Sequence, residues 1–328
     1  MPLKLLPSFA CVLLLVLFGA AFGADELKIY FKTTPGVKLL RPFREPADLV
    51  VLVTGADGRP VEQGSVDIRL DAPEPGPVFS TDFPLVEGTR LSEMRLPLRR
   101  GQASWKMLLP IRGEYRLSVD VAARDGRRAS KRFTFMIREN EKKWLALAGF
   151  SLGLFLLGFV AGRIFTGSRS AAAVLAALVL LSSPVKSSGA QENEGEGKAV
   201  LEIEPATVGK LSLVRWSRET ETASVSSPAL LTLIIEHLEK NKIAFAIDRI
   251  PVAREFSMRF HFTDGARYRV TTLAQIPGEA PLRNERVVDV TGVEPPARAM
   301  VPALVFFLSL IALGLGVGRW SKRHKSAA

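Results

Sequence analysis

Short runs of alternating apolar and polar residues fill two long stretches of the chain. In the first stretch, residues 24–141, the runs are LKIYFK, DLVVLV, SVDIRL, SWKMLL, YRLSVDV and RFTFMI, separated by turns rich in proline and glycine. A period of two is typical of strands that bury one face. About six or seven short strands in one stretch predict an extracytoplasmic immunoglobulin-like β-sandwich domain.

The second stretch, residues 199–297, has the same pattern. Its candidate strands are AVLEIE, KLSLVRW, ALLTLII, KIAFAI, FSMRFHF and YRVTTLA. The run that begins at Leu230 also suits a short helix, but the polar sequence EKNK after it favours a hairpin, with His237 in the turn. We therefore predict a mainly β fold with two immunoglobulin-like β-sandwich domains and transmembrane α-helices.

Two uninterrupted apolar runs predict the transmembrane helices. Residues 144–162 contain nineteen consecutive uncharged residues, within an expected helix at 142–165. Residues 299–318 contain twenty, and a basic tail follows at 319–328. Runs of this length suffice to cross the apolar core of a bilayer. The N-terminal residues 1–23 have the basic, apolar and small-residue regions of an export signal, so we expect a cleaved signal peptide.

A further apolar segment at 171–187 follows a short expected cytoplasmic loop at 166–170. Its uninterrupted apolar run covers only residues 171–181, and a hydrophilic linker at 188–198 comes next. One interpretation is a short or re-entrant membrane helix. The other is a second signal sequence that is cleaved before Gln191, because Ser188 and Ala190 are small residues at the positions that a signal peptidase needs.

The net charge of +11 raises the question of whether the partner is nucleic acid or a membrane. Residues 24–141 carry +3 and residues 191–298 carry −2, so the excess lies elsewhere. It comes from ten basic residues in or beside the apolar segments: Lys4, Lys142, Lys143, Arg163, Arg169, Lys186, Arg319, Lys322, Arg323 and Lys325. Basic residues at membrane flanks indicate a lipid bilayer rather than nucleic acid, and their bias predicts that both domains are extracytoplasmic.

The two halves also share sequence. SWKMLLPIRGEYRL at 104–117 aligns without gaps with SMRFHFTDGARYRV at 257–270, and GFVAGRI aligns with GLGVGRW. We interpret the chain as an internal duplication. The paired residues predict structural roles: Tyr115 and Tyr268 as buried tyrosines of a late strand, and Gly158, Gly162, Gly314 and Gly318 as small residues for helix packing.

Few residues of the chain are candidates for catalysis or metal binding. Cys11, inside the signal, is the only cysteine, which argues against disulfides, thiolate metal sites and a cysteine nucleophile in the mature chain. Of the three histidines, His324 lies in the basic tail; His237 and His261 remain as weak candidates for a copper or zinc site. Because Leu108 occupies the position equivalent to His261, such a site is not duplicated. No nucleotide-binding or hydrolase motif is present, so we expect no cofactor.

One loop offers a candidate contact surface. The sequence TDFPLVEGTRLSEM at 81–94 places Phe83 beside proline and leucine. Such a loop either folds over the edge of its domain or remains exposed for a partner.

GEYRLSV and its counterpart ARYRVTT, each followed by a strand and a membrane helix, resemble membrane-anchored periplasmic sandwich domains of the FixH and YtkA-like kind. That resemblance implies copper handling or assembly of a respiratory oxidase. The domain order also resembles the large periplasmic subunit of copper membrane monooxygenases. No metal ligands carry over, because the Met and His pattern of a copper carrier is missing and residues 24–141 contain no histidine.

These observations predict a non-enzymatic accessory or interaction protein of a bacterial envelope complex. Its location would be the inner membrane, and its partner a membrane protein. The alternative is a periplasmic metal carrier or oxidase assembly factor, and a membrane-bound enzyme is the third possibility.

Overall fold

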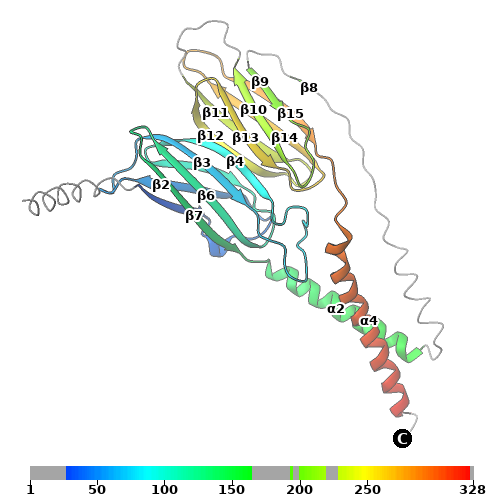
Figure 1. Ribbon diagram of the computed structural model, residues 1–328. Coiled ribbons are helices and arrows are strands. Elements are labelled where there is room, and N and C mark those ends of the chain that lie inside the picture. The colour runs from blue at the N-terminus through cyan, green and yellow to red at the C-terminus, as the bar shows by residue number, and fades with distance from the viewer. Residues whose placement is uncertain (1–26, 165–192, 195–198, 219–227, 326–328) are drawn as a thin grey trace, which may run out of the picture.

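The chain folds mainly as β-structure, with two long helices at one end (Figure 1). The computed structural model describes residues 27–164, 193–194, 199–218 and 228–325. The expected signal at 1–23, the loop at 166–170, the apolar segment at 171–187 and most of the linker at 188–198 lie outside these residues, as does Gln191. Within the described part, fifteen strands form one large antiparallel sheet.

The first half supplies seven of the described strands and the first long helix. The strands are β1 (Lys28–Thr34), β2 (Ala47–Thr54), β3 (Gln63–Asp71), β4 (Arg90–Arg99), β5 (Gln102–Met107), β6 (Gly113–Ala123) and β7 (Arg128–Ile137), with a 3-10 helix η1 (Val37–Leu39) after β1. The helix α2 (Glu141–Ile164) follows β7 within a few residues.

The second half has a similar order of elements. Its strands are β8 (Asn193–Glu194), β9 (Ala199–Ile203), β10 (Leu211–Arg218), β11 (Ala229–His237), β12 (Lys242–Val252), β13 (Glu255–His261), β14 (Arg267–Gln275) and β15 (Leu282–Asp289). The last helix is α4 (Ala297–Lys325). Leu230 lies at the start of strand β11, which begins at Ala229, and not in a helix, as the hairpin interpretation predicted. His237, expected in the turn, is instead the last residue of β11, because it pairs with both Lys242 and Tyr268 on the neighbouring strands.

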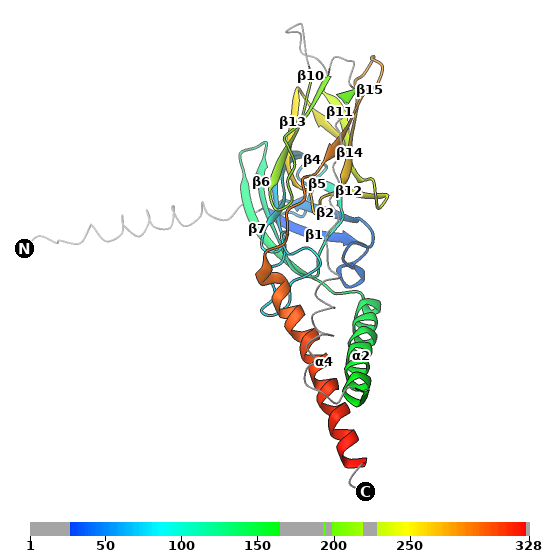
Figure 2. The ribbon, with the colours of Figure 1, turned by 90° about the vertical axis from the view of Figure 1, so that its right-hand side faces the viewer.

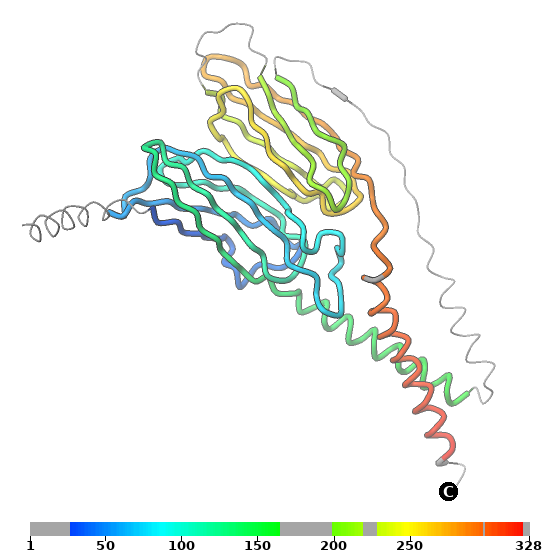
Figure 3. The backbone as a smooth tube through the Cα atoms, viewed as in Figure 1, coloured from blue at the N-terminus to red at the C-terminus, as the bar shows by residue number. Residues whose placement is uncertain are grey.

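The sheet consists of two runs of paired strands (Figure 3). One run has the order β7-β6-β3-β4-β13-β10-β9, and the other has the order β1-β2-β5-β12-β11-β14-β15-β8. The hairpin between β4 and β5 joins the runs through a single pair, Arg99 with Gln102. Each run therefore contains strands from both halves of the chain.

The halves meet at four strands, and we call the contact made by β4, β5, β12 and β13 the seam. In one run Met107 of β5 pairs with Phe245 of β12. In the other run Ser92 of β4 pairs with Phe260 of β13. Because these are backbone ladders between edge strands, the seam satisfies hydrogen-bonding groups that would otherwise be exposed.

Strict alternation of buried residues explains the core. In β2 every second residue from Ala47 to Val53 is buried, and β11 alternates in the same way. The buried side chains of both halves belong to one hydrophobic cluster, which includes Trp105, Trp216 and Phe245. The seam is consequently part of the core and not a wet contact between separate bodies.

Both helices leave the same end of the β-structure and run side by side away from it (Figure 2). Each is long and apolar enough to cross a membrane. The second span was expected at 299–318, and the helix α4 runs from Ala297 to Lys325, into the basic tail. Lysine and arginine are good helix formers, and their positive charges are favourable near a helix C-terminus, so the basic sequence extends the helix.

Candidate functional site

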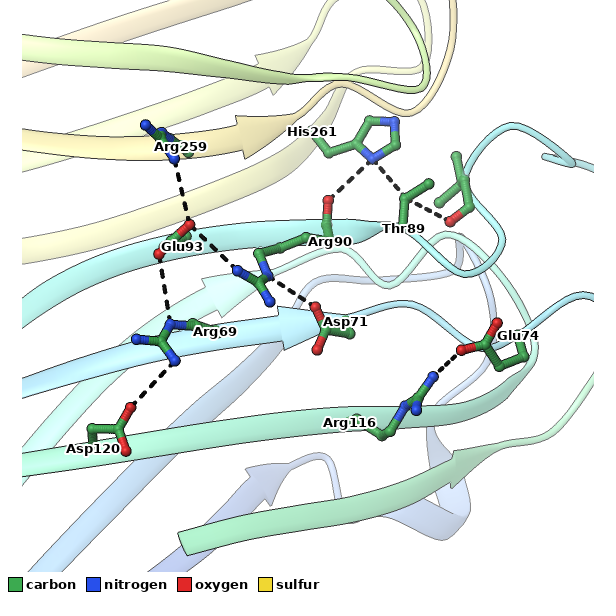
Figure 4. A network of polar contacts seen from close by, with 11 residues as sticks. Arg69, Asp71, Glu74, Thr89, Arg90, Glu93, Arg116, Asp120, Arg259 and His261 are labelled. Carbon is green, nitrogen blue, oxygen red and sulfur yellow. Dashed lines mark hydrogen bonds and ion pairs between the residues drawn. The ribbon is translucent and has the colours of Figure 1, made fainter. Parts of the chain in front are cut away.

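His261 ends β13 inside the seam and is only 1% exposed. The backbone N–H of Gly209 donates to its Nε2 atom over 2.9 Å. Because Nε2 accepts this bond, the ring proton of the neutral imidazole is on Nδ1, which lies 3.0 Å from the Thr89 hydroxyl oxygen and 3.3 Å from the Arg90 carbonyl oxygen (Figure 4). The imidazole thus links the second half to the start of β4.

The partners of His261 require it to be neutral. The Thr89 hydroxyl donates its own proton to the carbonyl oxygen of Val86 over 2.7 Å, so its oxygen is left to accept from Nδ1. Burial lowers the pKa of His261 to about 4, although the hydrogen bond to the Arg90 carbonyl acts in the opposite direction. A proton added at Nε2 would face the Gly209 N–H, which cannot accept a hydrogen bond.

His237 belongs to a second polar group on the same side of the seam. Its Nε2 atom lies 3.2 Å from Asp264 Oδ2, and its Nδ1 atom accepts the backbone N–H of Lys240 over 3.4 Å. Lys240 Nζ also donates to Asp264 over 2.6 Å, and the Tyr268 hydroxyl donates to the other carboxylate oxygen over 2.5 Å. Burial alone would raise the pKa of Asp264, but these three donors together lower it.

Two lysines extend this group to the loops of the first half. Lys240 Nζ lies 4.0 Å from the centre of the Phe43 ring, and Phe83 stacks on Phe43 at 5.4 Å. Lys242 Nζ donates to the backbone carbonyl oxygens of Phe43 and Arg44. Phe83 is therefore folded against the protein, while β4 begins at Arg90, within the segment 81–94 that was expected to be a loop.

The space between the two histidines is too small for a ligand. A cavity of about 10 Å³ is lined by His237, His261, Met107, Phe260 and Tyr268 among others, which is room for about one water molecule. The lone pair that a metal would need on each imidazole already accepts a backbone N–H. Among the described residues, no group of three or more histidine, cysteine, aspartate or glutamate side chains could hold a metal ion.

A row of ion pairs crosses the outer side of the seam (Figure 4). Arg69 lies 3.5 Å from Asp120 and 3.6 Å from Glu93, and Glu93 lies 3.6 Å from Arg90 and 3.8 Å from Arg259. These side chains are about one-third to two-thirds exposed, so each pair contributes less than about 1 kcal/mol. The row pairs opposite charges on β6, β3, β4 and β13. None of its carboxylates is left unpaired for acid–base chemistry.

Tyr115 and Tyr268 occupy equivalent places in the two halves. Each ring is buried, and each hydroxyl bonds to a residue four positions earlier in the chain. Tyr115 donates to the carbonyl oxygen of Ile111 over 2.7 Å, whereas Tyr268 donates to the side chain of Asp264. Burial raises the pKa of both hydroxyl groups far above the usual range, so they remain protonated and act as hydrogen-bond donors.

The four helix glycines lie where α2 and α4 touch. A Cβ added to Gly158 would overlap the backbone of Ile311, and one added to Gly314 would overlap the backbone of Phe155. Gly162 and Gly318 meet Leu315 and Phe159 in the same way. These contacts are reciprocal, since the chain positions 155 and 311, and 159 and 315, are separated by the same 156 residues as the glycine pairs.

A surface hollow of about 320 Å³ lies at the end of the β-structure that is far from the helices. It is lined by turn residues that include Asp57, Arg59, Asp125 and Arg127. Arg127 pairs with Asp125 at 2.6 Å, and Arg59 pairs with Asp57 at 3.5 Å. Each arginine is matched by a carboxylate from its own turn, which weakens the case for a charged ligand here.

The sequence identified the two histidines but not their partners. Thr89 and Gly209 are 172 and 52 residues from His261, and polar residues at such separations carry no periodic signal. Asp264 had a usable signal, because it precedes Tyr268 by the same four residues that separate Ile111 from Tyr115.

No family model matches the chain, and no curated protein matches it. Among solved structures, a 1.5-MDa bacterial ice-binding adhesin aligns with 82% of this chain and 66% of its own, at 9% identity and a TM-score of 0.24. Escherichia coli alpha-2-macroglobulin aligns with 82% of this chain and 17% of its own, at 12% identity and a TM-score of 0.26. Red sea bream transglutaminase aligns with 88% of this chain and 34% of its own, at 8% identity and a TM-score of 0.21. The chain thus spans less than two thirds of each of these proteins.

Proposed function

We propose that this chain is a non-enzymatic accessory protein of a bacterial envelope complex. Two immunoglobulin-like sandwiches form one extracytoplasmic body, and the helices anchor it in the inner membrane, where they dock with a membrane-protein partner. The observation that carries this proposal is the reciprocal seam, because it turns two small domains into one rigid binding body.

Strand order supports the duplication and the sandwich assignment. In the first half β1 pairs with β2 and β2 with β5, while β4, β3, β6 and β7 are paired in that order. In the second half β9 pairs with β10 and β10 with β13, while β12, β11, β14 and β15 are paired in that order. Two groups of three and four antiparallel strands are the layers expected of one sandwich.

The seam has the register of a two-fold contact. Met107 pairs with Phe245, and the positions 153 residues later and earlier, Phe260 and Ser92, pair with each other. The helix glycines repeat this reciprocity at an offset of 156 residues. A self-complementary contact is what a symmetric dimer makes, so we propose that the chain is a fused dimer whose pseudo-two-fold axis runs along the helices.

Rigidity favours a binding role. Two domains on separate membrane helices would tilt independently, whereas backbone ladders, a shared core and a helix crossing hold these two in one orientation. The polar groups of the seam bond to one another, as the surroundings of His261 and Asp264 illustrate. Such satisfied networks specify one structure, as a binding body requires.

The metal-carrier alternative receives less support. Copper or zinc at His237 and His261 would have to replace hydrogen bonds from Lys240 and Gly209 and would occupy a cavity of about 10 Å³. Neither the described geometry nor the sequence supplies a third ligand beside them.

The experiment is native mass spectrometry of the tagged protein, purified from its own membranes in mild detergent. We expect a membrane protein to co-purify in a fixed ratio. The perturbing variant is Gly158→Leu, which disrupts the helix crossing and should reduce the amount of bound partner. An isolated chain without a partner would contradict the proposal, and an isolated chain that carries copper would favour the metal carrier.

A further inference from the structure

The loop between β3 and β4 has no counterpart in the second half. It covers residues 72–89, whereas β11 and β12 are joined by residues 238–241 alone. In Figures 1 and 3 this loop, coloured cyan, reaches past the ends of the strands to the first turns of the two helices. The difference breaks the pseudo-symmetry at the membrane end of the molecule.

The base and the far arm of the loop are fixed by polar contacts. Glu87 accepts hydrogen bonds from the Ser80 hydroxyl, over 3.0 Å, and from the backbone N–H of Thr81. The backbone N–H of Gly88 donates to the carbonyl oxygen of Pro73 over 2.8 Å. These bonds close the loop below its tip, so the tip has a defined position.

Asp82 fixes the position of the loop along the length of the helices. Its carboxylate pairs with Lys143 in the first turn of α2. Lys143 immediately precedes Trp144, which begins the apolar span and is 54% exposed. Tryptophan and basic residues are typical of the membrane–water interface, which places Asp82 at the level of the lipid headgroups.

The tip lies deeper than Asp82. The Phe79 ring is 5.8 Å from the ring of Phe306, measured between centroids. Phe306 is seven residues beyond Ala299, where the apolar span of α4 begins, and at 1.5 Å per residue this is about 10 Å along the helix. Two contacts with two different helices therefore agree on how the loop is oriented.

The composition of the tip suits an apolar environment. Residues 75–79 carry no charge, and Val78 and Phe79 are 57% and 43% exposed. Pro73, Pro75 and Pro77 have no backbone N–H, so this stretch has fewer donors to satisfy where water is scarce. Exposed apolar side chains at this depth would meet lipid and not solvent.

We infer that residues 76–79 insert into the extracytoplasmic leaflet beside α4 and form a third membrane contact. The inference rests on the proposed membrane-spanning role of the helices. Its partner is the lipid itself, at the boundary between headgroups and acyl chains, where short apolar elements insert by about 5–10 Å. With this contact the seam and the helices are held at one tilt relative to the membrane.

The test uses single spin labels in the otherwise cysteine-free background Cys11→Ser. Val78→Cys reports the tip, Leu304→Cys reports an exposed position of α4 in the apolar span, and Ala56→Cys reports an exposed turn at the far end of the β-structure. Each full-length protein is placed in nanodiscs of phosphatidylethanolamine and phosphatidylglycerol. Collision with dissolved oxygen and with a water-soluble nickel chelate is then measured by electron paramagnetic resonance.

We expect the label at Val78 to collide with the nickel chelate severalfold less than the label at Ala56, and to resemble Leu304 in favouring oxygen. If Val78 resembles Ala56 while Leu304 remains protected, the lipid contact is wrong and the spanning helices stand. If Leu304 is also open to nickel, the proposed membrane anchoring fails. The same labels are also measured in native membranes. If the label at Val78 is shielded from the nickel chelate there but not in nanodiscs, a protein covers the tip and the lipid assignment is again wrong.

Discussion

Thr89 and His261 are 172 residues apart in the chain, yet the Thr89 hydroxyl oxygen lies 3.0 Å from His261 Nδ1. This contact joins the first residue before β4 to the last residue of β13, so it connects the two halves at the edge of the seam. The hydroxyl accepts from the imidazole because its own proton is already donated to Val86.

The stability of the seam should depend on pH through His261. Its pKa is 6.5 in an ordinary setting and about 4 in the folded chain, so the unfolded state binds more protons between these values. Stability is therefore complete above about pH 6.5 and falls as the pH drops towards 4, by up to about 3 kcal/mol. Thermal unfolding in detergent from pH 7.5 to 4.5 measures this fall.

The control for that experiment is His261→Gln, which removes the titrating group. We expect it to unfold at a lower temperature at pH 7.5 and to show a flatter pH profile than the native chain. An unchanged slope would assign the pH dependence to other groups. Asp264 does not supply this window, because its lowered pKa places its titration below its ordinary value of 3.8.

Thr89→Val should destabilise the protein by about 1–3 kcal/mol, because it leaves the buried Nδ1 proton of His261 with a weaker set of acceptors. Valine has nearly the same shape, so packing changes little. Thr134→Val is the matched control, since Thr134 is exposed on β7. Chemical denaturation of both variants measures the difference, and equal midpoints would show that the Thr89 contact contributes nothing.

Phe245→Ala should weaken the seam from within. Phe245 is fully buried and its backbone pairs with Met107 of the first half, while its ring lies 5.8 Å from Phe260 within the second half. Loss of a buried phenylalanine costs about 3–5 kcal/mol. Because β12, which carries Phe245, forms the seam with β5, we expect calorimetry to separate one unfolding transition into two. Phe133→Ala, a half-buried position at the far edge of the first half, should lower the transition temperature without dividing the transition.

Gly158→Leu should separate α2 from α4, because the new side chain meets the backbone of Ile311. Overpacking of this kind costs about 1–3 kcal/mol. Spin labels at Ile164→Cys and Trp320→Cys, in the Cys11→Ser background, report the helix separation by pulsed dipolar spectroscopy. Gly153→Leu is the control, since nothing lies within 4 Å of a Cβ at that glycine. Identical distance distributions in both variants would exclude the glycine crossing.

Features with a local cause could be predicted from the sequence. Apolar run length gave the two helices, and alternation gave the strands and the hairpin at Leu230, because burial of one face repeats every second residue. The repeated Y-R and G-x-x-x-G-R motifs drew attention to Tyr115 and Gly158, whose roles depend on neighbours four residues away or on a helix face. The helix α4 extends past residue 318 to Lys325, since helix formation can continue through a charged tail, and the end of the membrane span stays a prediction.

Tertiary structure alone decided how the halves meet. The ladders of β5 with β12 and of β4 with β13 are made by backbone groups, which every residue has. No side-chain pattern in the sequence therefore predicts them. The same holds for the surroundings of His261, which depend on Gly209 and Thr89 from distant loops. The contact between Phe79 and Phe306 likewise joins a loop of the first half to the last helix, which no local pattern indicates. The period of the apolar residues indicates which face of a strand is buried. Which other segment packs against that face is determined only in the folded chain.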